Sequence, residues 1–363
     1  MSIAEKTSTA VAVTEGTPLD RFVRGGVIPA HPLALTEDRK LDERRQRALS
    51  RYYIEAGSLG LAVAVHTTQF SIHDEHHELF EPVLSLAAAT AGEYPDRRPL
   101  LVAGVTGPTQ QAVAEAEIAR SLGYDLVLLA PYGTNDLEER DLIDRARAVG
   151  EVLPVIGFYL QRAVGGRYLS RSFWQALAET PNVVGIKIAP FDRYATLDVI
   201  HGVGRSGRSS SLALYTGNDD HIVMDLLTSY PTQSQDGTPL RLDVVGGLLG
   251  QWAVWVPGAV ETLRLVGRAK SGDRDALDAL IDLNPALTDA NGVIFDAANR
   301  FVGCIAGIHE VLRRQGLLEG LWFLDAHERL SPGQLEEIDR IWAAYPELRD
   351  DAFIEEHRDR WLS

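Results

Sequence analysis

The sequence has little cysteine, little lysine and no long apolar segment. Its only cysteine is Cys304, which excludes an internal disulfide and a cysteine-based metal cluster. The first 20 residues lack the basic start and apolar core of a signal peptide. The longest apolar window, residues 246–260, is interrupted by Gln251 and Pro257 and is too short to span a bilayer. We therefore expect a cytoplasmic protein with no membrane partner.

Basic residues are also outnumbered by acidic ones, 35 Lys and Arg against 51 Asp and Glu. The net charge is −16, and neither a run of Lys and Arg nor an interleaving of aromatic and basic residues occurs. A nucleic-acid surface needs a basic face, so no nucleic-acid partner is expected. A site for an anionic substrate would have to create its own local positive potential.

The few lysines make one of them conspicuous. Only four of the 35 Lys and Arg residues are lysines, and Lys187 stands in the apolar run Val-Val-Gly-Ile-Lys-Ile, residues 183–188. An ammonium group in a buried strand loses its hydration, which favours the neutral amine. Lysine, unlike arginine, can lose its proton and attack a carbonyl, so we predict a nucleophile. The alternative is a strand-end lysine whose head group reaches water.

The distribution of apolar residues predicts the fold. Short β-like runs alternate with helical patterns over about 250 residues, which is typical of a (β/α)₈ TIM barrel. The runs lie at 26–30, 61–66, 100–105, 125–130, 154–159, 183–188, 212–217 and 242–247. An open doubly wound sheet is the rival, but no Gly-rich phosphate loop follows the first run.

The domain organisation follows from the same pattern. We predict a flexible N-terminal arm at residues 1–20, the barrel at 21–260 and a helical C-terminal region at 261–363. Residues 205–211 and 229–241 are polar and rich in Gly, Ser and Pro, so both segments are predicted to be loops.

Barrel chemistry occurs at the C-terminal strand ends. The predicted ends carry His66–Gln69, Tyr132, Phe158 with Tyr159, Lys187, Thr216–Asp220 and Gly246–Gly247. This set suits imine chemistry, in which a lysine amine condenses with a ketone and a hydroxyl or phenol moves protons. Backbone N–H groups at Thr67 and Thr68 can hold a substrate carboxylate.

Three motifs resemble the dihydrodipicolinate synthase/N-acetylneuraminate lyase family. They are Gly-Ile-Lys-Ile-Ala (185–189), His-Thr-Thr-Gln (66–69) and Thr-Gly-Asn-Asp-Asp (216–220), in the family's order. The resemblance implies a barrel with a helical C-terminal region, a dimer or tetramer, and no cofactor beyond a covalent imine with pyruvate or another 2-oxo acid. It implies that Lys187 is the imine lysine, and that Thr67 and Thr68 bind the carboxylate and join the proton relay.

The sequence departs from the family at three places. Phe158 falls where the family has its strand-five tyrosine, and Tyr159 comes one residue later, which on a strand is the other face. Either a bulge returns Tyr159 to the pocket or the relay is rebuilt. Gly133 replaces the second tyrosine of Pro-Tyr-Tyr, and Ala163, beside Arg162, falls at the synthase's arginine. These departures argue against the lysine-forming synthase reaction.

We therefore predict a Schiff-base lyase, an aldolase or dehydratase, that acts on a 2-oxo-3-deoxy acid or a pyruvate aldol adduct. The catalytic candidates are Lys187, Tyr159 and Thr67, and the substrate-binding candidates are Thr68, His66, Tyr132, Asn218 and Gly247. Tyr159 fits a packed core aromatic equally well, and residues 218–220 also fit a helix N-cap.

Two other functions stay open. A metal-dependent barrel hydrolase could use His66 with the histidines at 73–77, although His76 and His77 are not expected to share one face and a solvated helix start is favoured. The missing tyrosines would also fit a non-catalytic barrel that binds a ligand.

Overall fold

Eight parallel strands form a barrel in the computed structural model, which describes residues 14–363. The strands are β1 (Val27–Pro29), β2 (Gly60–Val63), β3 (Leu100–Val105), β4 (Leu126–Leu129), β5 (Val155–Leu160), β6 (Val183–Ala189), β7 (Ala213–Thr216) and β9 (Pro239–Leu249). Their order is β1-β9-β7-β6-β5-β4-β3-β2, and a parallel bridge between Ala30 and Ala62 joins the two ends. The predicted (β/α)₈ barrel is confirmed.

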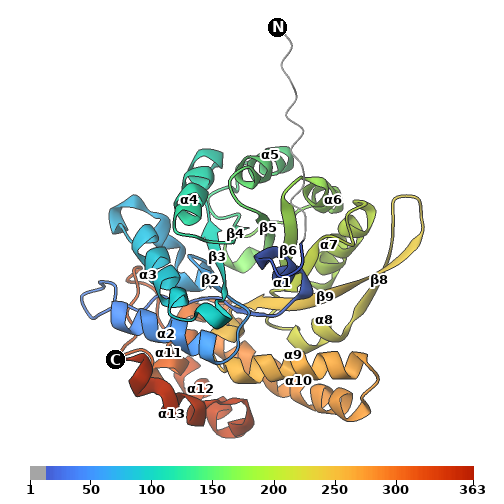
Figure 1. Cartoon of the computed structure of the whole chain (residues 1–363). Coiled ribbons are helices and arrows are strands. Elements are labelled where there is room, and N and C mark those ends of the chain that lie inside the picture. The colour runs from blue at the N-terminus through green and yellow to red at the C-terminus, as the bar shows by residue number, and fades with distance from the viewer. Residues whose placement is uncertain (1–13) are drawn as a thin grey trace.

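Helices cover the outside of the ring of strands (Figure 1). They are α2 (Glu43–Glu55), α3 (Phe80–Gly92), α4 (Thr109–Ser121), α5 (Glu139–Gly150), α6 (Arg171–Glu179), α7 (Arg193–Arg205), the short α8 (Ile222–Leu227) and α9 (Val256–Lys270). Helix α6 illustrates why they form: Ser170 caps its start by accepting from the N–H of Phe173, and its apolar face buries Trp174 and Leu177.

The C-terminal region is helical, as expected. Helices α10 (Arg274–Ile294), α11 (Cys304–Arg314), α12 (Gln334–Ala344) and α13 (Asp351–Trp361) gather on one side of the ring, at the bottom of Figure 1. Trp361 of α13 is fully buried 5.6 Å from the ring of Tyr52 on α2, and Tyr52 donates a hydrogen bond to Asp350. The region is thereby packed against the barrel rather than tethered to it.

A short helix closes the N-terminal end of the barrel. The predicted arm lies outside the described residues up to residue 13, and helix α1 (Pro18–Arg24) begins within its last part because Thr17 caps the helix and Pro18 fits its first turn. In Figure 1, α1 lies across the centre of the ring. There Phe22 stacks on Tyr215 at 4.7 Å between ring centroids.

The loop predicted for residues 229–241 is wrong. Strand β8 (Ser229–Gln233) pairs antiparallel with the first half of β9, from Ser229 opposite Asp243 to Gln233 opposite Pro239. The hairpin projects beyond the helices at the right of Figure 1. Its alternation is hidden by polar residues, since Tyr230 and Thr232 are buried while Pro231 takes an exposed edge position that does not need an N–H donor. Residues 206–212 do form an irregular connection.

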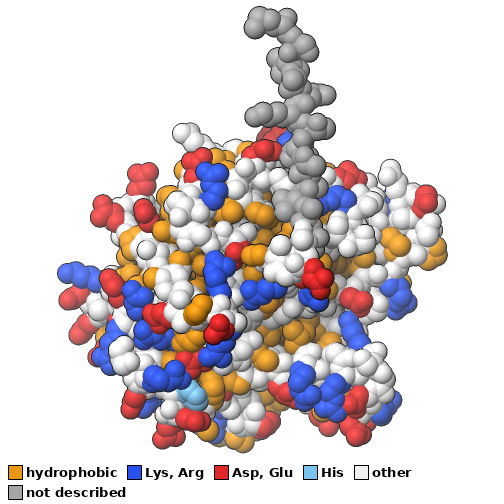
Figure 2. Space-filling view, in the orientation of Figure 1, with side chains coloured by type: hydrophobic (Ala, Val, Ile, Leu, Met, Phe, Trp, Pro, Cys, Tyr) orange, Lys and Arg blue, Asp and Glu red, His pale blue; other side chains and the backbone are white. Residues whose placement is uncertain are grey.

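Acidic and basic side chains are interspersed on the face shown in Figure 2, and no extended basic patch stands out there. Among residues 14–363, no helix is both long enough and apolar enough to cross a membrane.

Candidate active site

A small cavity opens at the C-terminal mouth of the barrel, the end opposite α1. Its volume is about 40 Å³, which is room for roughly three water molecules and thus for one compact polar ligand. The barrel contributes Ala30, Val65, His66, Thr67, Phe158, Leu160, Gln161, Val164, Lys187, Ala189, Phe191, Gly217, Asp219 and Gly250, and the C-terminal region contributes Phe295 and Cys304. Below it the barrel interior is filled by apolar side chains such as Ile28, Val102, Leu128 and Ile156.

Lys187 points into this cavity. Its position on β6 lies opposite Phe158 of β5, and its Nζ is 4.3 Å from the centroid of the Phe158 ring. The side chain is 7% exposed. Burial lowers the pKa of Lys187 from 10.5 to about 8, although the nearby Asp219 acts in the opposite direction. A Cβ at Gly217 would lie 2.6 Å from Cε of Lys187, so the glycine leaves the lysine its space.

Asp219 lies in the same cavity and was not singled out in the sequence. It follows β7, is 5% exposed, and accepts a hydrogen bond from the N–H of Gln251 at 2.7 Å. Burial raises its pKa to about 7, with Lys187 opposing the rise. Asp219 belongs to the Thr-Gly-Asn-Asp-Asp motif, but neither the motif nor the predicted helix N-cap at residues 218–220 indicates which of these residues faces the cavity.

The turn after β2 separates the two threonines. Ala64 (φ 61°) and Gln69 (φ 67°) are both in the left-handed region, which non-glycine residues enter at a cost, and they frame a 3₁₀ turn at His66–Thr68. Thr67 lines the cavity. Thr68 is fully buried; its hydroxyl donates to the carbonyl of His31 at 2.6 Å and accepts from the N–H of Val65. Thr68 therefore shapes the turn, and only Thr67 faces the cavity.

His66 also lines the cavity. Burial, reinforced by the charge of Lys187, lowers its pKa to about 4, so the ring is neutral at pH 7.

Tyr159 does not reach the cavity. It lies opposite Ile188 with its side chain outside the barrel wall, where its ring is 4.7 Å from that of Trp174. Its hydroxyl is 3.5 Å from the N–H of Leu169. The register shift in β5 occurs earlier, between Val155 and Ile156, and leaves Phe158 facing inwards. The alternative of a packed core aromatic fits the structure, and the catalytic interpretation does not.

Three predicted substrate-binding residues also lie outside the cavity lining. Tyr132 is 40% exposed and stacks on Phe70 at 4.6 Å. Gly247 faces away, since a Cβ there would lie 2.6 Å from the Trp252 ring. Asn218 is fully buried: its amide donates to Asp225 at 2.8 Å and its carbonyl oxygen accepts from the N–H of Phe191. Asn218 thus positions Phe191, a cavity residue, without reaching the ligand space.

The histidines considered for a metal hydrolase do not form one group. His66 lies in the cavity, whereas His73 is bound to the carbonyl of Ala64 and to Glu115. His76 and His77 gather with Asp74 on a separate turn. Within residues 14–363, the structure therefore gives no support to the predicted set of His66 with residues 73–77.

The profile of the Dihydrodipicolinate synthetase family matches residues 24–229. A 4-hydroxy-tetrahydrodipicolinate synthase of Moorella thermoacetica is 28% identical over 208 residues, which is 56% of this chain and 66% of the relative. One of Chelativorans sp. is 29% identical over 169 residues, 45% of this chain and 55% of the relative. The chain thus spans between half and two thirds of the length of these curated relatives.

Solved structures share the fold at low identity. A chloride-inhibited dihydrodipicolinate synthase from Acinetobacter baumannii, complexed with pyruvate, has a TM-score of 0.68 at 21% identity and covers 92% of this chain and 99% of its own. The N-acetylneuraminate lyase from Fusobacterium nucleatum has a TM-score of 0.68 at 16% identity, with 90% of this chain and 100% of its own covered. At these identities the likeness supports the fold alone.

Proposed function

The chain belongs to the dihydrodipicolinate synthetase family, and from this premise we propose that it is a lyase that forms a Schiff base between Lys187 and a small 2-oxo acid. The observation that carries the proposal is a lysine amine, buried in a small cavity at the barrel mouth, whose pKa is lowered to about 8. The chemistry needs no metal and no organic cofactor, since the iminium itself is the electron sink.

The reaction follows from the amine. The neutral Nζ adds to the C2 carbonyl of the acid, and loss of water gives an iminium. When the C3–C4 bond breaks, its electron pair enters the iminium to form an enamine, and the 4-hydroxyl loses its proton as C4 becomes a carbonyl. Protonation at C3 and hydrolysis then release pyruvate and free the lysine. Dehydration starts from the same iminium: loss of a proton from C3 gives an enamine in which the C3–C4 bond is intact, and this enamine expels the 4-hydroxyl group, which takes up a proton and leaves as water.

The carboxylate of the acid has one suitable position. Thr67 is the threonine of the turn after β2 that lines the cavity, and its hydroxyl makes only a long hydrogen bond of 3.3 Å to the carbonyl of His31. The lysine supplies positive charge locally in a chain whose net charge is −16. We assign carboxylate binding to Thr67 and the shaping of its turn to Thr68.

Proton transfer needs a group other than Tyr159. Of the titratable groups in the cavity, Asp219 has its pKa raised to about 7, near the value at which a group both gives and takes protons at neutral pH. Its Oδ1 is held by Gln251, which fixes the carboxyl at the cavity wall. We assign the transfers at the 4-hydroxyl and at C3 to Asp219, with neutral His66 as the second acceptor.

The absence of the synthase's arginine argues against one of the possible reactions. Arg162 is exposed, with its guanidinium 5.9 Å from the Tyr168 ring centroid, and does not line the cavity. This placement supports an aldolase or dehydratase rather than the lysine-forming synthase reaction. A dimer or tetramer and a cytoplasmic location stay predictions.

Tyr159→Phe should leave turnover within about threefold of the parent enzyme, because the phenol hydroxyl lies outside the barrel wall. Its loss removes only a long hydrogen bond to Leu169, so stability should fall by no more than about 1 kcal/mol. Steady-state kinetics with the best 2-oxo acid and thermal unfolding test both statements. A loss of turnover comparable to that of a lysine variant would return Tyr159 to the mechanism.

Adduct formation should rise with pH. Since only the neutral amine attacks, the initial rate of imine formation at subsaturating pyruvate should climb through a midpoint near the pKa of about 8 and then level off. An exposed lysine would give a midpoint near 10.4. Cyanoborohydride trapping, quantified by mass spectrometry between pH 6 and 10, measures this midpoint, and a midpoint near 10 would contradict the desolvated amine.

A further inference from the structure

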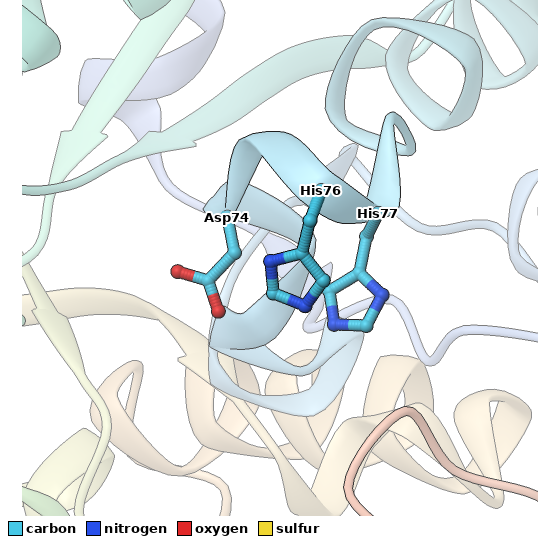
Figure 3. Close-up of side chains that lie close together, drawn as sticks. All are labelled: Asp74, His76 and His77. Carbon is cyan, nitrogen blue, oxygen red and sulfur yellow. The ribbon is translucent and has the colours of Figure 1, made fainter.

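A second set of converging side chains lies outside the barrel mouth, on the turn between β2 and α3. Asp74, His76 and His77 project to the same side of this turn (Figure 3). One potential ligand atom from each residue lies within 4.8 Å of the others, and the two imidazole centroids are 3.9 Å apart. The expectation that His76 and His77 would not share one face is wrong, because the segment is a 3₁₀ turn and not the start of an α-helix.

Main-chain hydrogen bonds hold the turn without help from these three side chains. The N–H groups of Asp74, His77 and Glu78 donate to main-chain carbonyls three residues earlier. His73 anchors the segment, since its side chain is 2% exposed, with Nε2 3.0 Å from the carbonyl of Ala64 and Nδ1 3.0 Å from Glu115. Asp74, His76 and His77 make no side-chain hydrogen bond or ion pair within residues 14–363, so their ligand atoms are free.

The neighbourhood carries negative charge that no cation balances. Asp74 is at the edge of a cleft of about 1170 Å³ between this turn and helices α3 and α4, and no Lys or Arg lines the cleft. Glu75, Glu78 and Glu81 line it as well, and within the described residues none of them forms an ion pair. In a chain that pairs many of its surface carboxylates with arginine, this cleft has a field that attracts cations.

We propose that Asp74, His76 and His77 bind a divalent transition-metal ion, with Zn²⁺ as the best match. Two imidazole nitrogens and one carboxylate oxygen form a donor set that Zn²⁺ accepts, while Ca²⁺ and Mg²⁺ prefer oxygen ligands. Tetrahedral bonds of about 2.0–2.1 Å bring ligand atoms to about 3.3 Å from each other, and small rotations of exposed side chains cover the difference. Water completes the coordination. The ion would clamp the turn that continues the Thr67 side of the cavity.

Zn²⁺ titration of the untagged, chelator-treated full chain tests the site. Isothermal titration calorimetry should give one tight site per chain, and Co²⁺ should give visible absorption bands typical of nitrogen ligation. His76→Ala and His77→Ala should each weaken binding about 100-fold, and Asp74→Asn about tenfold. His327→Ala is the matched control, because His327 is exposed and follows Asp325 at the same spacing but lacks a second histidine. It should bind Zn²⁺ like the parent chain.

Asp74 and His76 are exposed and His77 is half-buried, and none of them belongs to the core, so their variants should fold like the parent chain in the absence of metal. Zn²⁺ should raise the melting temperature of the parent chain and of Lys187→Ala alike, but not that of the double variant His76→Ala/His77→Ala. The proposal is overturned if the parent chain shows no stoichiometric binding, or if the double variant binds Zn²⁺ as tightly as the parent. Either result would leave the Schiff-base proposal untouched.

Discussion

Lys187→Met should abolish the adduct that borohydride traps with pyruvate and lower turnover by about a thousandfold or more, which is ~4 kcal/mol of transition-state stabilisation. Methionine keeps the length and apolar contacts of the lysine stem beside Phe158 but has no amine. Intact-mass and peptide mass spectrometry should place the parent's adduct on Lys187. Lys270→Met is the control, because Lys270 lies on α9, paired with Asp243, and should change neither adduct nor turnover.

Lys187→Met should fold, so a loss of adduct and turnover would report the missing amine and not an unfolded chain. Lys187 is charged at a cost in its buried position, so the loss of the amine removes a desolvation penalty. It also removes the cation that favours the charged form of Asp219, and the pKa of Asp219 should rise further. The protonated, neutral carboxyl of Asp219 can stay buried in the cavity without unfolding the variant. An adduct that persists in Lys187→Met, or that maps to another lysine, would defeat the proposed function.

Asp219→Asn should lower turnover by about 10²- to 10⁴-fold, the usual contribution of a general acid-base group. The asparagine keeps an oxygen to accept from the N–H of Gln251, so the turn after β7 should keep its shape. Proton exchange of the pyruvate methyl group with D₂O, followed by NMR, isolates the C3 step from carbon–carbon cleavage. This exchange should be lost with turnover in Asp219→Asn.

The pH dependence of trapping separates two roles of Asp219, its effect on the pKa of Lys187 and its role in proton transfer. Its carboxylate holds the pKa of Lys187 above the value that burial alone would give, so Asp219→Asn should shift the midpoint of adduct formation below about 8. Trapping would then proceed at neutral pH while methyl exchange fails. His66→Ala is the comparison variant: if it loses exchange and Asp219→Asn keeps it, His66 and not Asp219 is the proton carrier.

The barrel and its lysine were accessible from sequence because each depends on local pattern. Apolar runs that alternate with helical patterns predict the strands. A lysine within such a run is conspicuous in a chain whose other cations are mostly arginine. The direction of Tyr159 was not accessible, since it depends on where β5 shifts register against β6. Asp219 was hidden for a similar reason. Which member of Asn218–Asp220 faces inwards is decided by the turn that follows β7, not by the composition of the segment.

Long-range packing accounts for the rest. Phe295 and Cys304 reach the cavity from a helical region whose sequence pattern says only that it is helical. The hairpin at residues 229–249 was hidden by its polar composition, and Tyr230 shows what fixes it: its hydroxyl donates to the buried Asp225 at 2.8 Å. Neither feature has a local signature in the chain.

The cavity is assembled from two parts of the polypeptide that can change separately. Lys187, Thr67 and Asp219 lie within the matched segment 24–229, whereas Phe295 and Cys304, which form part of the wall, lie beyond it. Substitutions in the later part would therefore reshape the wall of the cavity while Lys187, Thr67 and Asp219 themselves stay unchanged. The proposed chemistry would then extend to new substrates through substitutions in a region that contains none of the proposed reacting groups.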